Sequence, residues 1–341
     1  MRFFLIITII LYCVSPSHSE ELHIYSWTEY IPNRVIDDFT KETGIKVIHS
    51  TFDSNEAMFV KLQLLGGNGG YDLILPSSYY LTRLKKSNLL LPLDKNKLSN
   101  LHNIDADFMN KPYDPRNQYS IPYLWGLTGI LYNQKYIKND IRKWQDLFNP
   151  DFKNQLLLLE DMREIFDIAL LTLGLKPNST NPQAIKIAFE KLQTLMPNVK
   201  IWNSESPKVA FINEDVKIGI AWNGEAYMAS KHNNNLKFVL PAEGAILWMD
   251  NLAIPKGAKN IENAYKFIDF ILRPEIAQYI TQEIGYSTPN GAAFAMLPLE
   301  VANNQIAYPS KEYIKKCFFQ EDVGSKLKLY MEYWEKLRLM N

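Results

Sequence analysis

Cysteine is scarce in this 341-residue chain, which carries only Cys13 and Cys317. Cys13 lies in the apolar N-terminal segment, so a chain that loses this segment keeps one cysteine and forms no internal disulfide. The formal net charge is zero, and a chain without a basic excess is not expected to bind nucleic acid. The sequence also lacks low-complexity tracts, blocks of like charge and internal repeats. These absences argue against a disulfide scaffold, a nucleic-acid binder and a repeat protein.

Long apolar runs are also missing, and the one apolar stretch near the start is typical of a secretory signal peptide at residues 1–19. Arg2 supplies a positive start, and residues 3–13 form an apolar run too short to span a bilayer. Ser17 and Ser19 are the small residues expected before cleavage at the Ser19–Glu20 bond. We therefore expect an exported mature chain.

Two other interpretations of this segment are an uncleaved membrane anchor and a lipoprotein anchor at Cys13. The short run disfavours the first, and Tyr12 stands where a lipoprotein signal places a small residue. We expect a free periplasmic protein with no stable membrane insertion after the signal is removed.

Common enzyme motifs are absent, namely HExxH, GxSxG, the P-loop and CxxC. The histidines at 23, 49, 102 and 232 are scattered and suggest no ligand set. The sequence predicts no catalytic residues, no metal site and no cofactor. A glycosidase that uses two acids, with Asp161 or Glu164 as the general acid, stays open as an alternative.

The composition predicts a folded protein of two lobes, because 47% of the residues are hydrophobic and 341 residues exceed the size of one core. Apolar alternation, helical periodicity and glycine breaks give the order strand, helix, strand, helix, strand over residues 22–26, 32–44, 45–52, 54–65 and 71–76. This order predicts a parallel sheet with helices on both faces, in which ligands bind beyond the carboxyl ends of the strands.

The middle of the chain repeats this pattern. Strands are expected at 156–159 and 216–221, with a helix at 162–173 between them. Residues 123–129 and 246–255 are candidate strands that cross between the lobes, and the remainder is mainly helical, most clearly at 264–272 and 325–337.

The predicted strand ends collect aromatic and acidic side chains. The aromatic ones are Trp27, Tyr30, Tyr79, Trp222 and Trp248, and the acidic ones are Glu29, Asp161, Glu164 and Asp250. Aromatic faces attract organic cations and cover methylene chains, and carboxylates pair with ammonium groups. A flexible chain with spaced amines is the ligand that suits this mixture best, since each buried amine needs its own carboxylate.

Each signal also has a purely structural interpretation. Asp161 and Glu164 fit a capping box at the start of a helix. Trp27 and Tyr30 can fasten a helix onto the core, Trp248 can be an ordinary buried residue, and adjacent tyrosines at a strand end are often packing residues.

Several longer stretches carry a resemblance to a known family. They are residues 27–30, 39–48, 119–123, 195–199, 248–250, 284–286 and 320–324. Through them the chain resembles the spermidine/putrescine-binding periplasmic proteins of ABC importers, with a similarity that runs from about Leu22 to the C-terminus. Glu160, Asn251 and Phe319 depart from the pattern expected of that family.

The resemblance implies a type II periplasmic-binding-protein fold, α/β in class, with the ligand closed between two lobes joined by crossing strands. It implies an N-terminal lobe of residues 20–126 plus 249–294 and a C-terminal lobe of 127–248 plus 295–341. The ligand-binding residues that it implies are Trp27, Thr28, Glu29, Tyr30, Ser77, Tyr79, Asp161, Glu164, Trp222, Trp248, Asp250, Tyr286 and Gln320. Tyr286 and Gln320 come from the resemblance alone.

The expected function is capture of spermidine or putrescine and delivery to the permease subunits of an ABC importer, by a protein that is not an enzyme. A solute receptor of the same fold for another ligand remains an alternative, for example a ferric-ion receptor that uses Tyr79 and Tyr80.

Overall fold

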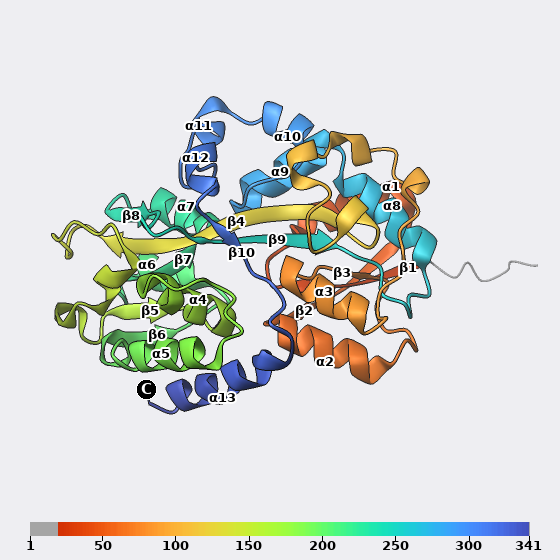
Figure 1. The fold of residues 1–341 in the computed structure, drawn as a ribbon. Helices are drawn as coiled ribbons and strands as arrows, with labels where there is room; N and C mark the ends of the chain where they lie inside the picture. The colour runs from red at the N-terminus through yellow and green to blue at the C-terminus, as the bar shows by residue number, and fades with distance from the viewer. Residues whose placement is uncertain (1–19, 341) are drawn as a thin grey trace, which may run out of the picture.

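The computed structural model describes residues 20–340, so the predicted signal peptide lies outside the described residues. The protein is α/β and has two lobes, which the long strands β4 and β9 connect (Figure 1). The strands are β1 (Glu21–Trp27), β2 (Lys46–Phe52), β3 (Leu73–Ile74), β4 (Ile121–Asn133), β5 (Leu156–Leu158), β6 (Val199–Trp202), β7 (Ile218–Trp222), β8 (Leu236–Val239), β9 (Ile246–Leu252) and β10 (Phe318–Phe319).

Helices cover both sheets. They are α1 (Asn33–Thr43), α2 (Asn55–Leu65), α3 (Ser78–Lys86), α4 (Met162–Thr172), α5 (Pro182–Gln193), α6 (Pro207–Ile212), α7 (Asn223–His232), α8 (Ile261–Ile271), α9 (Pro274–Ile284), α10 (Gly291–Ala295), α11 (Leu299–Ala302), α12 (Lys311–Ile314) and α13 (Leu327–Arg338). Within residues 20–340, no helix combines the length and apolar character needed to cross a bilayer.

The first lobe contains a parallel sheet, as the sequence predicts, and the structure gives its strand order as β2-β1-β3. The helix boundaries also follow the sequence signals. Gly44 ends α1 with φ at 75°, a left-handed conformation that glycine adopts without strain. The Ser54 hydroxyl caps α2 by accepting a hydrogen bond from the Ala57 N–H at 3.1 Å.

The predicted strand at 71–76 is shorter than expected, because only Leu73 and Ile74 form the regular ladder. Beyond it the chain turns toward β9, and isolated antiparallel bridges join Ile74 to Ala253 and Ser77 to Asp250. Tertiary pairing with β9 therefore replaces a longer parallel strand, and it brings Ser77 against Asp250.

The second sheet has the order β10-β9-β4-β7-β5-β6, and β8 pairs with β4. All thirteen residues of β4 are buried, which explains the continuous apolar character of this segment. One end of β4 pairs with β9 and the other end with β7, both antiparallel. The strand thus runs from one lobe into the other, and the predicted crossing segments are confirmed as strands.

Separate hydrophobic clusters fill the two halves of the molecule. One gathers buried side chains from β5, α4, α5, β7 and α13, and another gathers them from β1, α1, α8 and α9. Figure 1 shows these groups of elements on opposite sides of the crossing strands. We keep the lobe boundaries expected from the sequence as a proposal, and the separate clusters support it.

Gly219 is the position in β7 where the sheet leaves no room for a side chain. A Cβ atom there would lie 2.4 Å from the Leu157 carbonyl oxygen and 2.8 Å from its nitrogen, both of which are backbone atoms of β5. The Gly219→Ala change is therefore expected to lower the free energy of unfolding by about 1–3 kcal/mol, as overpacking does in other cores. Urea unfolding followed by circular dichroism measures this loss.

Gly174→Ala is the control for that experiment. Gly174 has φ at 67°, so alanine is strained there, but no atom would lie within 4 Å of its Cβ. We expect a loss of only about 1 kcal/mol from backbone strain. Equal losses in the two variants would contradict the packing argument.

Candidate functional site

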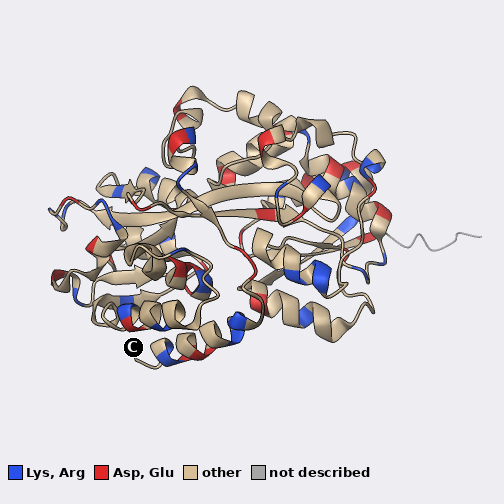
Figure 2. Ribbon diagram, in the orientation of Figure 1, with Lys and Arg blue, Asp and Glu red and all other residues tan. Residues whose placement is uncertain are grey.

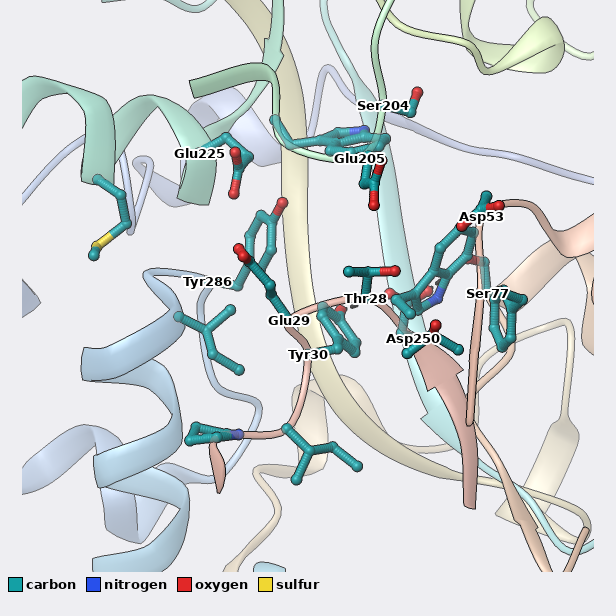
Figure 3. Close-up of a pocket in the computed structure, with 18 of the residues that line it drawn as sticks. Thr28, Glu29, Tyr30, Asp53, Ser77, Ser204, Glu205, Glu225, Asp250 and Tyr286 are labelled. Atoms are coloured by element: carbon teal, nitrogen blue, oxygen red, sulfur yellow. Dashed lines mark hydrogen bonds between the residues drawn. The ribbon is translucent and has the colours of Figure 1, made fainter. Parts of the chain in front are cut away.

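A cavity of about 670 Å³ lies between the lobes at the crossing strands. All predicted site residues except Tyr79 line it. Those that line it are Trp27, Thr28, Glu29, Tyr30, Ser77, Asp161, Glu164, Trp222, Trp248, Asp250, Tyr286 and Gln320. Figure 3 shows several of them converging on one space from the loop after β1, from β9 and from the segment that follows α9.

Asp250 is the first of the buried carboxylates. It lies on β9 with 5% of its surface exposed. The Tyr30 hydroxyl donates to Oδ2 and the Ser77 hydroxyl donates to Oδ1, each at 2.6 Å. Burial raises the pKa of Asp250 to about 6, although both hydroxyl donors act in the opposite direction. An ionised Asp250 therefore has hydrogen-bond donors but no ion-pair partner within residues 20–340.

Glu164 on α4 forms a second buried carboxylate. The Thr128 hydroxyl donates to Oε2 at 2.7 Å, and the Trp222 indole N–H donates to Oε1 at 3.0 Å. Thr128 and Trp222 are direct partners in the antiparallel pairing of β4 with β7, so the sheet register places both donors. Burial raises the pKa of Glu164 well above its usual value, and the nearby charge of Asp161 raises it further.

Asp161 forms one of the two hydrogen bonds expected of a capping box at the start of α4. Its side chain accepts a hydrogen bond from the Glu164 N–H at 2.9 Å and caps α4, as predicted. The second bond of a capping box, from the Asp161 N–H to the Glu164 side chain, does not form, because the Glu164 carboxylate accepts hydrogen bonds from Thr128 and Trp222 instead. Burial raises the pKa of Asp161, while its backbone hydrogen bonds, Arg163 and Gln320 oppose that rise. Both acids face the cavity.

Aromatic rings form the walls between these acids. The Trp248 and Tyr286 rings meet edge to face, with centroids 4.9 Å apart, and Tyr286 approaches Tyr30 at 6.0 Å. Trp27 packs on Phe52 at 4.6 Å. Such packing holds the rings rigidly, so their faces stay available to a cation or a methylene chain.

The loop after β1 carries Glu29 in an uncommon conformation, with φ at 54°. A left-handed backbone costs a residue other than glycine about 1–2 kcal/mol, so neighbouring contacts must hold it. One such contact is the Tyr123 hydroxyl, which donates to the Tyr30 carbonyl at 2.9 Å. The loop directs Glu29 toward α6, where its Oε2 lies 3.2 Å from the Lys208 ammonium.

Tyr79 lies outside the cavity lining. It is buried on α3, its hydroxyl accepts a hydrogen bond from the Asn55 amide at 3.3 Å, and its ring packs against Tyr80 at 4.9 Å. Asn55 also exchanges hydrogen bonds with Ser77. The structure thus places Tyr79 behind Ser77, where it supports the wall.

The sequence analysis did not select several residues of this site, among them Thr128, Glu225 and Lys208. Thr128 gave no signal, because its role comes from the β4–β7 register. Glu225 stands three residues after the end of β7, at the start of α7, and this position was a usable signal. Lys208 is placed by tertiary packing alone: its ammonium lies 3.1 Å from Glu225 Oε1.

The cavity has an excess of carboxylates. Of the cations that line it, Arg34 pairs with Asp38 on its own helix and Lys208 pairs with Glu225 and Glu29. Among residues 20–340 no ion pair involves Asp250, Asp161 or Glu164. Along the rest of the chain, residues of both charge signs are interspersed, as the ribbon of Figure 2 shows. This arrangement is suited to an organic cation.

The three departures from the expected family pattern do not line the cavity. Glu160 forms an ion pair with Arg338, Asn251 is buried and donates to the Met249 carbonyl, and Phe319 lies on β10. Differences in ligand selectivity are therefore to be sought in other residues.

Comparisons with known proteins agree with this geometry. Among curated relatives, the chain is 46% identical over 323 residues to the spermidine/putrescine-binding periplasmic protein of Salmonella typhimurium, covering 94% of this chain and 92% of the relative. It is 45% identical to the protein of the same name from Escherichia coli K12, covering 95% and 94%.

A solved structure from Listeria monocytogenes, named for a spermidine/putrescine ABC transporter, superposes with a TM-score of 0.91 at 38% identity, covering 95% of this chain and all of that one. The spermidine/putrescine ABC transporter substrate-binding protein PotD of Streptococcus pneumoniae gives a TM-score of 0.81 at 38% identity, covering 94% and 99%. The family model described as bacterial extracellular solute-binding protein matches residues 34–307. The chain belongs to this family of bacterial extracellular solute-binding proteins.

Proposed function

We propose that this protein captures spermidine or putrescine in the periplasm and delivers it to the permease of an ABC importer. The observation that carries the proposal is the set of buried carboxylates, Asp250, Asp161 and Glu164, which have hydroxyl, indole and backbone donors but no ion-pair partner in residues 20–340. A ligand ammonium supplies the missing positive charge. The names of the curated relatives, which are spermidine/putrescine-binding periplasmic proteins, support both the ligand class and the location.

Capture follows from the placement of these groups on two lobes. Asp250 lies on β9 in the proposed N-terminal lobe, and Glu164 lies on α4 in the proposed C-terminal lobe. An extended diamine therefore contacts both acids only when the two lobes are close together. Trp248 and Tyr286 cover the methylene chain between the charged ends. Binding therefore favours a closed form by a hinge motion, and the closed form is the species that a permease would recognise.

The iron alternative has less support. It needs Tyr79 and Tyr80 as ligands, but both side chains are buried in the core of the first lobe, and neither lines the cavity. Within the described residues, no group of histidine, cysteine, aspartate and glutamate side chains is arranged to hold a metal ion.

The ligand class is tested by titrating the mature protein, freed of ligand by unfolding and refolding, in a calorimeter. Spermidine, putrescine, maltose and ferric citrate form the panel. We expect saturable one-to-one binding of the polyamines alone, because only they bring spaced ammonium groups to the buried acids. A folded sample that binds neither spermidine nor putrescine would refute the proposal.

Asp250→Asn separates a binding role from a structural one. The amide cannot compensate an ammonium charge, so polyamine affinity is expected to fall by roughly 10- to 100-fold. Stability is expected to change in the opposite direction. Because the pKa of the carboxyl rises from its usual 3.8 to about 6 in the folded state, ionisation of Asp250 destabilises the folded protein progressively between these two pH values and fully above pH 6. Removal of the charge at pH 7.5 is therefore expected to stabilise the empty protein by about 1–3 kcal/mol.

The stability gain should shrink at pH 4.5, where wild-type Asp250 is protonated in the folded state. Thermal unfolding at the two pH values measures it. Asp107→Asn is the matched control, since that exposed carboxylate pairs with Lys311 and does not line the cavity. A variant at Asp250 that is destabilised equally at both pH values would show that the carboxylate is a structural group.

A further inference from the structure

Lys208 contacts carboxylates from both sides of the cavity. It lies on α6, and its ammonium is 3.1 Å from Glu225 Oε1 on α7 and 3.2 Å from Glu29 Oε2 in the loop after β1. Glu225 belongs to the predicted C-terminal lobe and Glu29 to the N-terminal one. We call this three-residue arrangement the Lys208 bridge.

The Glu225 contact fixes the position of the ammonium. The Lys208 backbone N–H donates to Glu225 Oε2 at 3.2 Å, while the ammonium of the same residue donates to Oε1. One buried carboxylate thus holds both ends of the lysine residue, and α6 packs directly on α7. The Glu29 side chain is 67% exposed, so its contact is the weaker and more easily exchanged half of the bridge.

The bridge lies in the same cavity as the unpaired acids. In the view of Figure 3, Glu225, Glu29 and Tyr286 are drawn on one side of Tyr30, and Asp250 and Ser77 on the other side. Besides Asp53, Glu205 and Glu283, which also line the cavity, its acids occupy three positions: Asp250, the pair of Asp161 and Glu164, and the pair of Glu225 and Glu29. Of these three positions, only the third forms an ion pair with a protein cation in residues 20–340.

This difference has a consequence for ligands with different numbers of amines. The two uncompensated positions can accept the two ammonium groups of a diamine. A third ammonium near Glu29 and Glu225 would meet the like charge of Lys208, and like charges at such short range repel strongly in a partly buried site. It could bind only by displacing the lysine from Glu29.

We propose that Lys208 acts as a built-in ammonium at the third acidic position and so biases the site toward diamines over triamines. This inference rests on the proposed polyamine-binding function. It makes Lys208 and Glu225 selectivity residues, although neither was among the predicted ligand contacts. It also accounts for a lysine in a cavity that otherwise attracts cations.

The test compares spermidine and putrescine affinities by calorimetry for the wild type and for two variants. In Lys208→Met the third position loses its own cation, so the ratio of spermidine to putrescine affinity is expected to rise about tenfold. In Glu225→Gln the lysine stays and one carboxylate is lost, so the ratio is expected to fall. The two variants break the same ion pair but are expected to shift the ratio in opposite directions.

A purely structural bridge behaves differently. If Lys208 only holds the lobes together, both variants weaken the same contact, and they change the two affinities in parallel or shift the ratio in the same direction. Either result would overturn the inference. Lys208→Arg, which keeps the charge, is expected to retain the wild-type ratio. Lys200→Met is the control, because that exposed ammonium donates to the Asp215 carbonyl and does not line the cavity.

The design also separates this inference from the proposed function. A wild-type protein that binds neither polyamine would refute the function itself, whatever the variants do. A wild type that binds both, with an unchanged ratio in folded Lys208→Met and Glu225→Gln, would leave the function standing and refute the role of Lys208. Circular dichroism of each variant confirms that it is folded.

Discussion

The buried carboxylates between the lobes are the constraint on which the rest of this structure depends. Burying an ionised acid without a cation is costly, and burial raises the pKa of Asp250, Glu164 and Asp161 together. Hydroxyl, indole and backbone donors reduce that cost but do not remove it. In the empty protein these carboxylates have no neutralising cation, and a cationic ligand supplies one. The free-energy cost of burying the acids is incurred when the protein folds, so ligand binding relieves it and gains affinity.

The crossing strands position both the buried acids and their hydrogen-bond donors. β9 carries Asp250, and β4 carries Thr128, which donates to Glu164. Because β4 pairs with β9 at one end and with β7 at the other, a single strand connects the elements that carry the two acidic groups. The apolar cores on either side make each lobe a rigid support. Changes in lobe separation therefore act on the ligand contacts and leave the internal geometry of each acidic group intact.

Much of the fold could be predicted from local signals. The α1 end at Gly44, the Ser54 cap of α2 and the Asp161 cap of α4 each follow from backbone chemistry within a few residues. The site was reached through strand ends and a family resemblance. Sequence reasoning missed what depends on distant contacts: the Thr128–Trp222 pairing that holds Glu164, the placement of Tyr79 behind Ser77, and the bridge from Lys208 to Glu29. No local pattern specifies these contacts, because segments far apart in the chain create them.

Proton release on ligand binding tests the central role of the buried acids most directly. Putrescine is titrated into the ligand-free protein at pH 6.0 and pH 7.5, in pairs of buffers with different ionisation enthalpies. The account predicts that binding releases protons at pH 6.0, because the ligand lowers the pKa of an Asp250 carboxyl that titrates near pH 6 in the empty site, and that the part of the release that comes from Asp250 is smaller at pH 7.5. Binding with no proton release at pH 6.0, or with proton uptake, would contradict the claim that the ligand replaces protons on uncompensated carboxylates.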